Sequence, residues 1–181
     1  MSELDQAWAV ALAKAELRAR EAGRTDISEY LALRTDNDLV RTIGSEWLFT
    51  MFESVVGERN RHDAGIHVST DDPHRFRIGT SEMVGRRLTF QKGVRKLYVE
   101  IGWPRTPRDG FIRGGGLARA SIKHTGIKSA NEELRLMINE AGTPAWVLQR
   151  KHGSHTEMNE EDVRHHIGVL LNDPQISSRH S

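Results

Sequence analysis

Two short motifs pair a histidine with a serine and could do chemistry on a phosphate ester. His67 and Ser69 alternate with apolar residues, and His152 and Ser154 repeat the His-x-Ser spacing near the C-terminus. In such an arrangement one imidazole can act as general base and the other as general acid, while the hydroxyls hold the phosphate oxygens. The motifs therefore raise the hypothesis of a two-histidine phosphodiesterase-like hydrolase. Two observations count against it: His152 has polar neighbours, which favours a loop, and the His-x-Ser spacing arises easily by chance.

The nine histidines also raise the question of a metal site. They gather with carboxylates in residues 62–74 and 152–166, and both side-chain types are metal ligands. Neither stretch contains His-Glu-x-x-His or another spacing that places ligands on one helix face. A PD-(D/E)xK nuclease site is excluded as well, because neither Glu82 nor Glu100 is followed two residues later by lysine. We predict no metal and no cofactor.

Charge is distributed unevenly along the chain. Residues 75–128 contain thirteen Lys and Arg against three Asp and Glu, whereas the whole protein carries a net charge of only +1. Residues 1–74 contain eight basic and fourteen acidic residues, and residues 129–181 contain five and eight. Such segregation creates a local positive field even at small net charge, and positive patches bind polyanions or acidic partners. The sequence therefore favours a binding domain for nucleic acid, for another polyanion or for an acidic protein.

The basic residues fall on predicted strands and on a glycine-rich connection. In residues 96–103 apolar residues alternate with Lys96, Tyr98 and Glu100, so these three should share one face of a sheet. Residues 104–116 carry three arginines and three consecutive glycines, without the Gly-Lys-Ser/Thr of a P-loop. An exposed sheet that combines a stacking tyrosine with cations can bind single-stranded nucleic acid. The predicted polyanion-binding residues are Arg86, Arg87, Lys92, Arg95, Lys96, Tyr98, Arg105, Arg108, Phe111, Arg113, Arg119 and Lys123.

An alternative is that the acidic helices of the same chain cover this sheet and neutralise its charge internally. A second class of function then becomes the leading one, a protein–protein interaction or regulatory domain. Its interface would be the segment 37–59, which is apolar almost all round at helical spacing. Such a helix belongs either in the core or in the seam of a homodimer.

The elements that must position these residues form an α+β pattern, with N-terminal helices, a central antiparallel sheet and then helix–strand–helix. Helices are predicted over about 2–23, 26–33 and 36–59, and the apolar period changes from 3.6 to 2 at about residue 64. Turns are expected at residues 72–73, at Gly85 and at residues 92–93.

The last third of the chain is predicted to return to helix after a strand over residues 117–124. A capping box of Ser129 and Glu132 predicts a helix that ends at Gly142. A buried strand is expected over residues 145–148, and Asn159 should cap the closing helix.

Length and composition place the chain among ordinary globular proteins. We predict a single α+β domain over residues 1–175, with a helical part, 1–60, a sheet-containing part, 61–175, and a disordered tail, 176–181. The absence of cysteine excludes disulfides and thiolate catalysis. No stretch has the composition of a signal peptide or of a membrane span, so a cytoplasmic protein without a membrane partner is expected.

Overall fold

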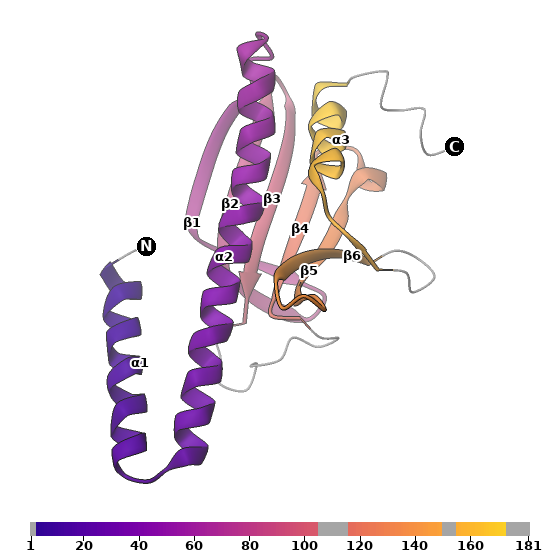
Figure 1. Cartoon of the computed structure of the whole chain (residues 1–181). Helices are drawn as coiled ribbons and strands as arrows, with labels where there is room; N and C mark the ends of the chain where they lie inside the picture. Colours follow the sequence, from indigo (N-terminus) through magenta and orange to yellow (C-terminus); the bar gives the residue numbers. More distant parts are fainter. Residues whose placement is uncertain (1–2, 105–115, 150–154, 173–181) are drawn as a thin grey trace. The chain divides into compact units, whose positions relative to one another are not determined.

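The computed structural model describes residues 3–104, 116–149 and 155–172 and confirms the predicted α+β class. Helices lie at the N-terminal and C-terminal ends of the chain, and a seven-stranded antiparallel sheet lies between them (Figure 1). The chain divides into two compact units, residues 1–42 and residues 43–181. The predicted tail, 176–181, lies outside the described residues. No described helix has the length and hydropathy that a membrane span requires.

The first unit is a pair of helices. Helix α1 (Glu3–Glu21) is rich in alanine, the residue with the highest helix propensity, and it ends where Gly23 adopts a φ of +69°. Helix α2 (Thr25–Arg61) begins directly afterwards. The Arg20 Nε donates to the Ser28 hydroxyl at 2.9 Å, which ties the end of α1 to the start of α2.

Helix α2 is a single helix of 37 residues, so the break predicted between residues 33 and 36 was wrong. Neither glycine nor proline occurs there, and the polar side chains that suggested a boundary bond within the helix instead. The hydroxyl of Thr35 donates to the carbonyl of Leu31 at 3.0 Å, and Arg41 pairs with Asp38 at 2.8 Å. Because these polar side chains bond within the helix, they do not offer its backbone an alternative partner, and the helix continues through this segment.

The sheet has the simplest strand order, with each strand pairing antiparallel with the next along the chain. The strands are β1 (His67–Ile78), β2 (Ser81–Lys92), β3 (Arg95–Trp103), β4 (Ala118–His124), β5 (Glu132–Ile138), β6 (Pro144–Gln149) and β7 (His155–Glu157). The turn at residues 92–93 and the strands at 117–124 and 145–148 are confirmed; β7 was not predicted.

Two of the predicted turns lie inside strands. β1 continues through Asp72-Pro73 with only a shift of register between Asp71 and His74. Gly85 is in the middle of β2, opposite Gly102 of β3. A Cβ atom on Gly85 would lie 1.9 Å from the carbonyl oxygen of Ile101, so glycine is needed there for close backbone approach.

Helices cover one face of the sheet, which we call the inner face. The C-terminal half of α2 packs on it through Phe52, whose ring stacks on Phe90 of β2 with centroids 5.7 Å apart. The indole N–H of Trp146 donates to the carbonyl of Gly44 at 2.7 Å, which joins β6 to α2. The largest fully buried side chains are Trp146, Phe49, Phe52, Phe90, Leu48, Met83, Leu88, Leu97, Ile101, Ile122, Leu134 and Leu136.

The helix predicted over residues 129–142 is absent. Its place is taken by a 3₁₀ turn, η2 (Lys128–Ala130), and by strand β5. Leu134 and Leu136 are fully buried while Arg135 between them is not, which is the period of a strand. Because β5 pairs with strands on both sides, ladder hydrogen bonds outweigh the local helix signal of Ser129 and Glu132.

The closing helix, α3 (Glu160–Leu171), is confirmed together with its cap. The Asn159 side chain accepts the N–H groups of Glu161 and Asp162, and the Asp162 carboxylate accepts the N–H of Asn159. Beside α2, Arg164 donates to Glu58 at 2.6 Å, and this hydrogen bond holds the pKa of Glu58 below its usual range. α3 thus packs against both α2 and the inner face.

Candidate functional site

The face of the sheet opposite the helices, which we call the outer face, carries most of its polar side chains. Alternation along β2, β3 and β4 assigns these residues to it, and the register places them in cross-strand rows. One row runs Arg87, Glu100, Ser121, and the next runs Thr89, Tyr98, Lys123. The sequence prediction that Lys96, Tyr98 and Glu100 share a face agrees with this register.

One end of the outer face is apolar. Phe76 and Met83 are buried there and pack with Ile78. The ring of Phe76 lies over Gly102, where an added Cβ atom would come within 2.9 Å of it. His74 stacks on Phe76 with ring centroids 5.6 Å apart. The polar part of the face therefore lies nearer to the start of β3.

A buried carboxylate organises the middle of the outer face. Glu100, whose side chain is 8% exposed, accepts a hydrogen bond from His74 Nε2 at 2.8 Å and another from Lys123 Nζ at 2.7 Å. Each carboxylate oxygen has one of these partners. A buried carboxylate needs such partners to remain charged. Glu100 thereby fixes the position of the Lys123 ammonium group.

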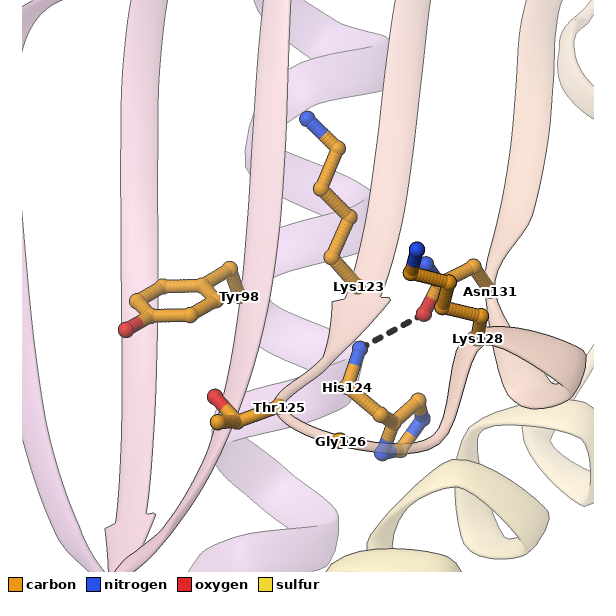
Figure 2. A pocket seen from close by; sticks show the side chains of 7 residues that line it. All are labelled: Tyr98, Lys123, His124, Thr125, Gly126, Lys128 and Asn131. Carbon is orange, nitrogen blue, oxygen red and sulfur yellow. Dashed lines mark hydrogen bonds between the residues drawn. The ribbon is translucent and has the colours of Figure 1, made fainter.

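A pocket of about 510 Å³ lies where β3 begins and β4 ends (Figure 2). Tyr98 and Lys123 come from the outer face, and the other lining residues come from the chain that leads from β4 through η2. Figure 2 shows the imidazole of His124 directed toward α3, while its backbone N–H donates to the Asn131 side-chain oxygen at 2.8 Å. The lining residues are Tyr98, Lys123, His124, Thr125, Gly126, Lys128 and Asn131.

The ring of Tyr98 is held from one side. The Arg87 guanidinium lies over it, 5.4 Å from the ring centroid, and Arg87 is itself bound to Asp71 through Nε at 2.9 Å and Nη2 at 2.8 Å. An arginine fixed by a carboxylate can stack on an aromatic face and restrict the ring. Only the other face of the Tyr98 ring is left for a ligand.

A second basic pair lies farther along the same face. Arg119 of β4 and Arg135 of β5 are directly opposite in the register, and Glu133 lies 4.0 Å from Arg119. Burial, followed by the charge of Arg135, lowers the pKa of Arg119 from its ordinary value. The proximity of two guanidinium groups makes this part of the sheet electropositive.

The structure separates the predicted polyanion-binding residues into three groups. Arg87, Lys96, Tyr98, Arg119 and Lys123 lie on the outer face. Arg86 lies on the inner face, where it is bound to Glu46 and covers the ring of Phe49. Arg95 has the same alternation as the buried inner-face residues of β3, and Lys92 donates to the carbonyl of Ala64. Arg105, Arg108, Phe111 and Arg113 lie outside the described residues.

Arg86 and Arg87 therefore cannot both contribute to one face of the sheet. Consecutive residues of a strand point to opposite faces, so only one of two adjacent arginines can lie on the outer face. The same alternation separates Arg95 from Lys96.

The predicted catalytic residues are only partly described. His67 and Ser69 are exposed on β1, an edge strand, opposite Gln91 and Thr89. His152 and Ser154 lie outside the described residues, so the two-histidine hydrolase stays a prediction. No group of three or more metal-binding side chains is found in residues 3–104, 116–149 and 155–172.

Sequence reasoning missed a buried chain of hydrogen bonds next to the pocket. His124 Nε2 and His166 Nδ1 are 3.0 Å apart, and His166 Nε2 lies 3.2 Å from Glu132 Oε2. Burial, reinforced by the charges of His166 and His165, lowers the pKa of His124 to about 4. The helical spacing of His166 from Val163 and Leu170 was the available signal in the sequence.

Comparisons with protein-family models, with curated proteins and with solved structures find no match to this chain. The function is therefore inferred from the site alone.

Proposed function

We propose that the protein is a binding domain that holds a nucleic acid or another polyanion on the outer face of its sheet. The observation that carries the proposal is the pocket that Tyr98, Lys123 and Lys128 line together. Cations combined with an aromatic ring on an open sheet suit a charged strand whose bases can stack.

Internal neutralisation limits the charge that is available. Arg87 is paired with Asp71 and Lys123 with Glu100, so the excess of basic residues in the sequence overstates the field of the outer face. Lys96 and Lys128 form no ion pair with a described carboxylate and supply charge that phosphates can use. We expect moderate affinity that depends strongly on salt.

The test is fluorescence anisotropy of labelled single-stranded DNA, double-stranded DNA and inorganic polyphosphate at several salt concentrations. The logarithm of the binding constant should fall linearly with the logarithm of salt, because phosphate contacts release counterions. The double variant Lys96→Ala/Lys128→Ala should reduce the magnitude of this slope by about 1 for each lysine. Lys14→Ala, an exposed lysine of α1, is the matched control and should leave the slope unchanged. Absence of binding to all three probes at low salt would overturn the proposal.

A second candidate function, self-association through α2, is supported by exposed apolar residues on that helix. Ile43 and Trp47 are 49% and 47% exposed, whereas Leu48 and Phe52 are fully buried against the sheet. The helix therefore has an apolar surface besides the one in the core, as the seam of a homodimer requires.

Light scattering coupled to size exclusion tests the homodimer. Trp47→Glu should convert a dimer into a monomer, while Val94→Glu should not, because Val94 is 92% exposed at the turn between β2 and β3. A monomeric parent protein at about 100 μM would contradict this candidate, since stable homodimers persist far below that concentration.

A further inference from the structure

The polar groups that line the pocket are almost all hydrogen-bond donors. Lys123 and Lys128 offer ammonium groups, and Thr125 offers a hydroxyl. The side-chain oxygen of Asn131 already accepts the backbone N–H of His124, so its amide turns its NH₂ group to other partners. The adjacent Glu100 has a partner on each oxygen. A lining of this kind favours an anionic group over a cation or a neutral donor.

The aromatic ring adds a second requirement. Arg87 lies over one face of the Tyr98 ring, and Tyr98 lines the pocket. A flat group that enters the pocket can stack on the free face of the ring at little entropic cost, because Arg87 and Asp71 already hold the ring in place. An inorganic anion has no planar group that could stack on this face of the ring.

The size of the pocket also exceeds what a single phosphate needs. Its volume of about 510 Å³ lies within the range of about 300–1,000 Å³ that is usual for sites of drug-sized ligands. Figure 2 shows Tyr98 and Thr125 at one side of the pocket and Lys128 and Asn131 at the other, with Lys123 between them, so a ligand with an aromatic part and an anionic part can contact both the ring and a lysine.

We propose that the pocket binds one nucleotide of a single-stranded nucleic acid, with the base stacked on Tyr98 and a phosphate held by Lys123 and Lys128. This inference rests on the proposed function and names the form of polyanion that the site prefers. A duplex is disfavoured, because both faces of each paired base are covered by its neighbours. The contacts are to a base face and to phosphates, so we expect little dependence on base identity.

The experiment compares three probes of similar charge: an oligothymidylate, the same oligomer with abasic positions throughout, and inorganic polyphosphate. The parent protein should bind the oligothymidylate about tenfold more tightly than the abasic oligomer, since stacking of one base accounts for roughly that factor. Tyr98→Ala should abolish the preference and leave polyphosphate binding unchanged. Tyr98→Phe keeps the ring and should retain the preference. Lys128→Ala should weaken binding of all three probes.

The outcomes separate the two proposals. If polyphosphate and both oligomers bind equally well and Tyr98→Ala changes nothing, the nucleotide site is refuted while the polyanion surface stands. If no probe binds at low salt, both proposals fail. Circular dichroism and thermal unfolding of Tyr98→Ala guard against a folding defect, and Tyr98→Phe decides the matter should Tyr98→Ala fail to fold.

Discussion

The imidazoles of His124 and His166 stack with centroids 5.3 Å apart and share a hydrogen bond of 3.0 Å, although 42 residues separate them. The Glu132 carboxylate on the far side accepts from His166 Nε2, so a neutral His166 has its lone pair on Nδ1. His124 must then donate through Nε2. The chain Glu132–His166–His124 thus fixes both tautomers and joins α3 to the end of β4.

The stability of the protein should fall in mild acid because of His124. The folded protein keeps this imidazole neutral down to about pH 4, whereas the unfolded chain takes up a proton near pH 6.5. The unfolded state therefore binds more protons between these values, and the free energy of unfolding decreases by about 3 kcal/mol as the pH falls through the window. Urea unfolding at several pH values measures this decrease.

The variant His124→Gln identifies the group responsible for the pH dependence. It should be less stable than the parent at pH 7.5 and should show a flatter profile between about pH 6.5 and pH 4. Exposed His62 provides the control, since His62→Gln should leave the profile unchanged. A profile of His124→Gln that runs parallel to that of the parent would contradict the assignment of the effect to His124.

Glycine at position 102 should be required for stability. A Cβ atom there would come within 2.9 Å of both the Phe76 ring and the carbonyl oxygen of Val84, so Gly102→Ala should destabilise the protein by about 2 kcal/mol or more. Gly57→Ala, in open space on α2, should instead stabilise it by about 0.5–1 kcal/mol through helix propensity. Thermal unfolding of the two variants makes the comparison, and equal melting temperatures would argue against the close approach of β1 to β3.

The hydrogen bond between Trp146 and Gly44 should account for part of the stability of the α2–sheet contact. Trp146→Phe removes the N–H donor and leaves a buried carbonyl without that partner, at a cost of about 1–3 kcal/mol. Trp47→Phe, at a half-exposed tryptophan, should change stability by less than about 0.5 kcal/mol. Guanidinium unfolding distinguishes the two, and similar midpoints for both variants would contradict the importance of this bond.

Release of Lys123 from its carboxylate should strengthen polyanion binding. Glu100→Gln removes the negative charge that faces Lys123 at 2.7 Å, so the full charge of the ammonium becomes available to a phosphate. We expect severalfold tighter binding of polyphosphate at low salt and a steeper salt dependence. Glu82→Gln, which frees the exposed Arg75 instead, is the control. Weaker binding by Glu100→Gln would mean that the direction of Lys123 matters more than its charge.

The sequence predicted correctly those helices and strands in which the spacing of apolar residues was unambiguous. Alternation in residues 96–103 correctly separated Lys96, Tyr98 and Glu100 from the core, and Asn159 was recognised as the cap of α3 because its local chemistry agrees with its tertiary role. The segment 132–138 was wrongly predicted to be helical. The spacing of Leu134, Met137 and Ile138 fits a helix, whereas the spacing of Leu134 and Leu136 fits a strand. Pairing with β4 and β6, which no local pattern reveals, decided between them.

The sequence predicted which types of residue form the candidate site better than it predicted how they are arranged. Tyr98 and Lys123 were found because they stand at polar positions of alternating segments. Lys128 and Asn131 were missed, since the helix expected from residue 129 onward would have placed them elsewhere. Arg86 was included among the predicted binding residues, whereas its alternation with Arg87 places it on the inner face. A count of charges along the sequence could not predict ion pairs between residues far apart in sequence, such as that of Lys123 with Glu100.

The order of the strands in the sheet is the order in which the ribosome makes them. Each strand can therefore pair with the strand that emerged just before it, without waiting for a distant segment of the chain. The packing of α2 on the sheet is completed later, because Trp146 is synthesised 102 residues after its partner Gly44. Until then the part of α2 around Gly44 lacks this partner on the nascent chain. We expect this helix to be the segment that a ribosome-associated chaperone binds during synthesis.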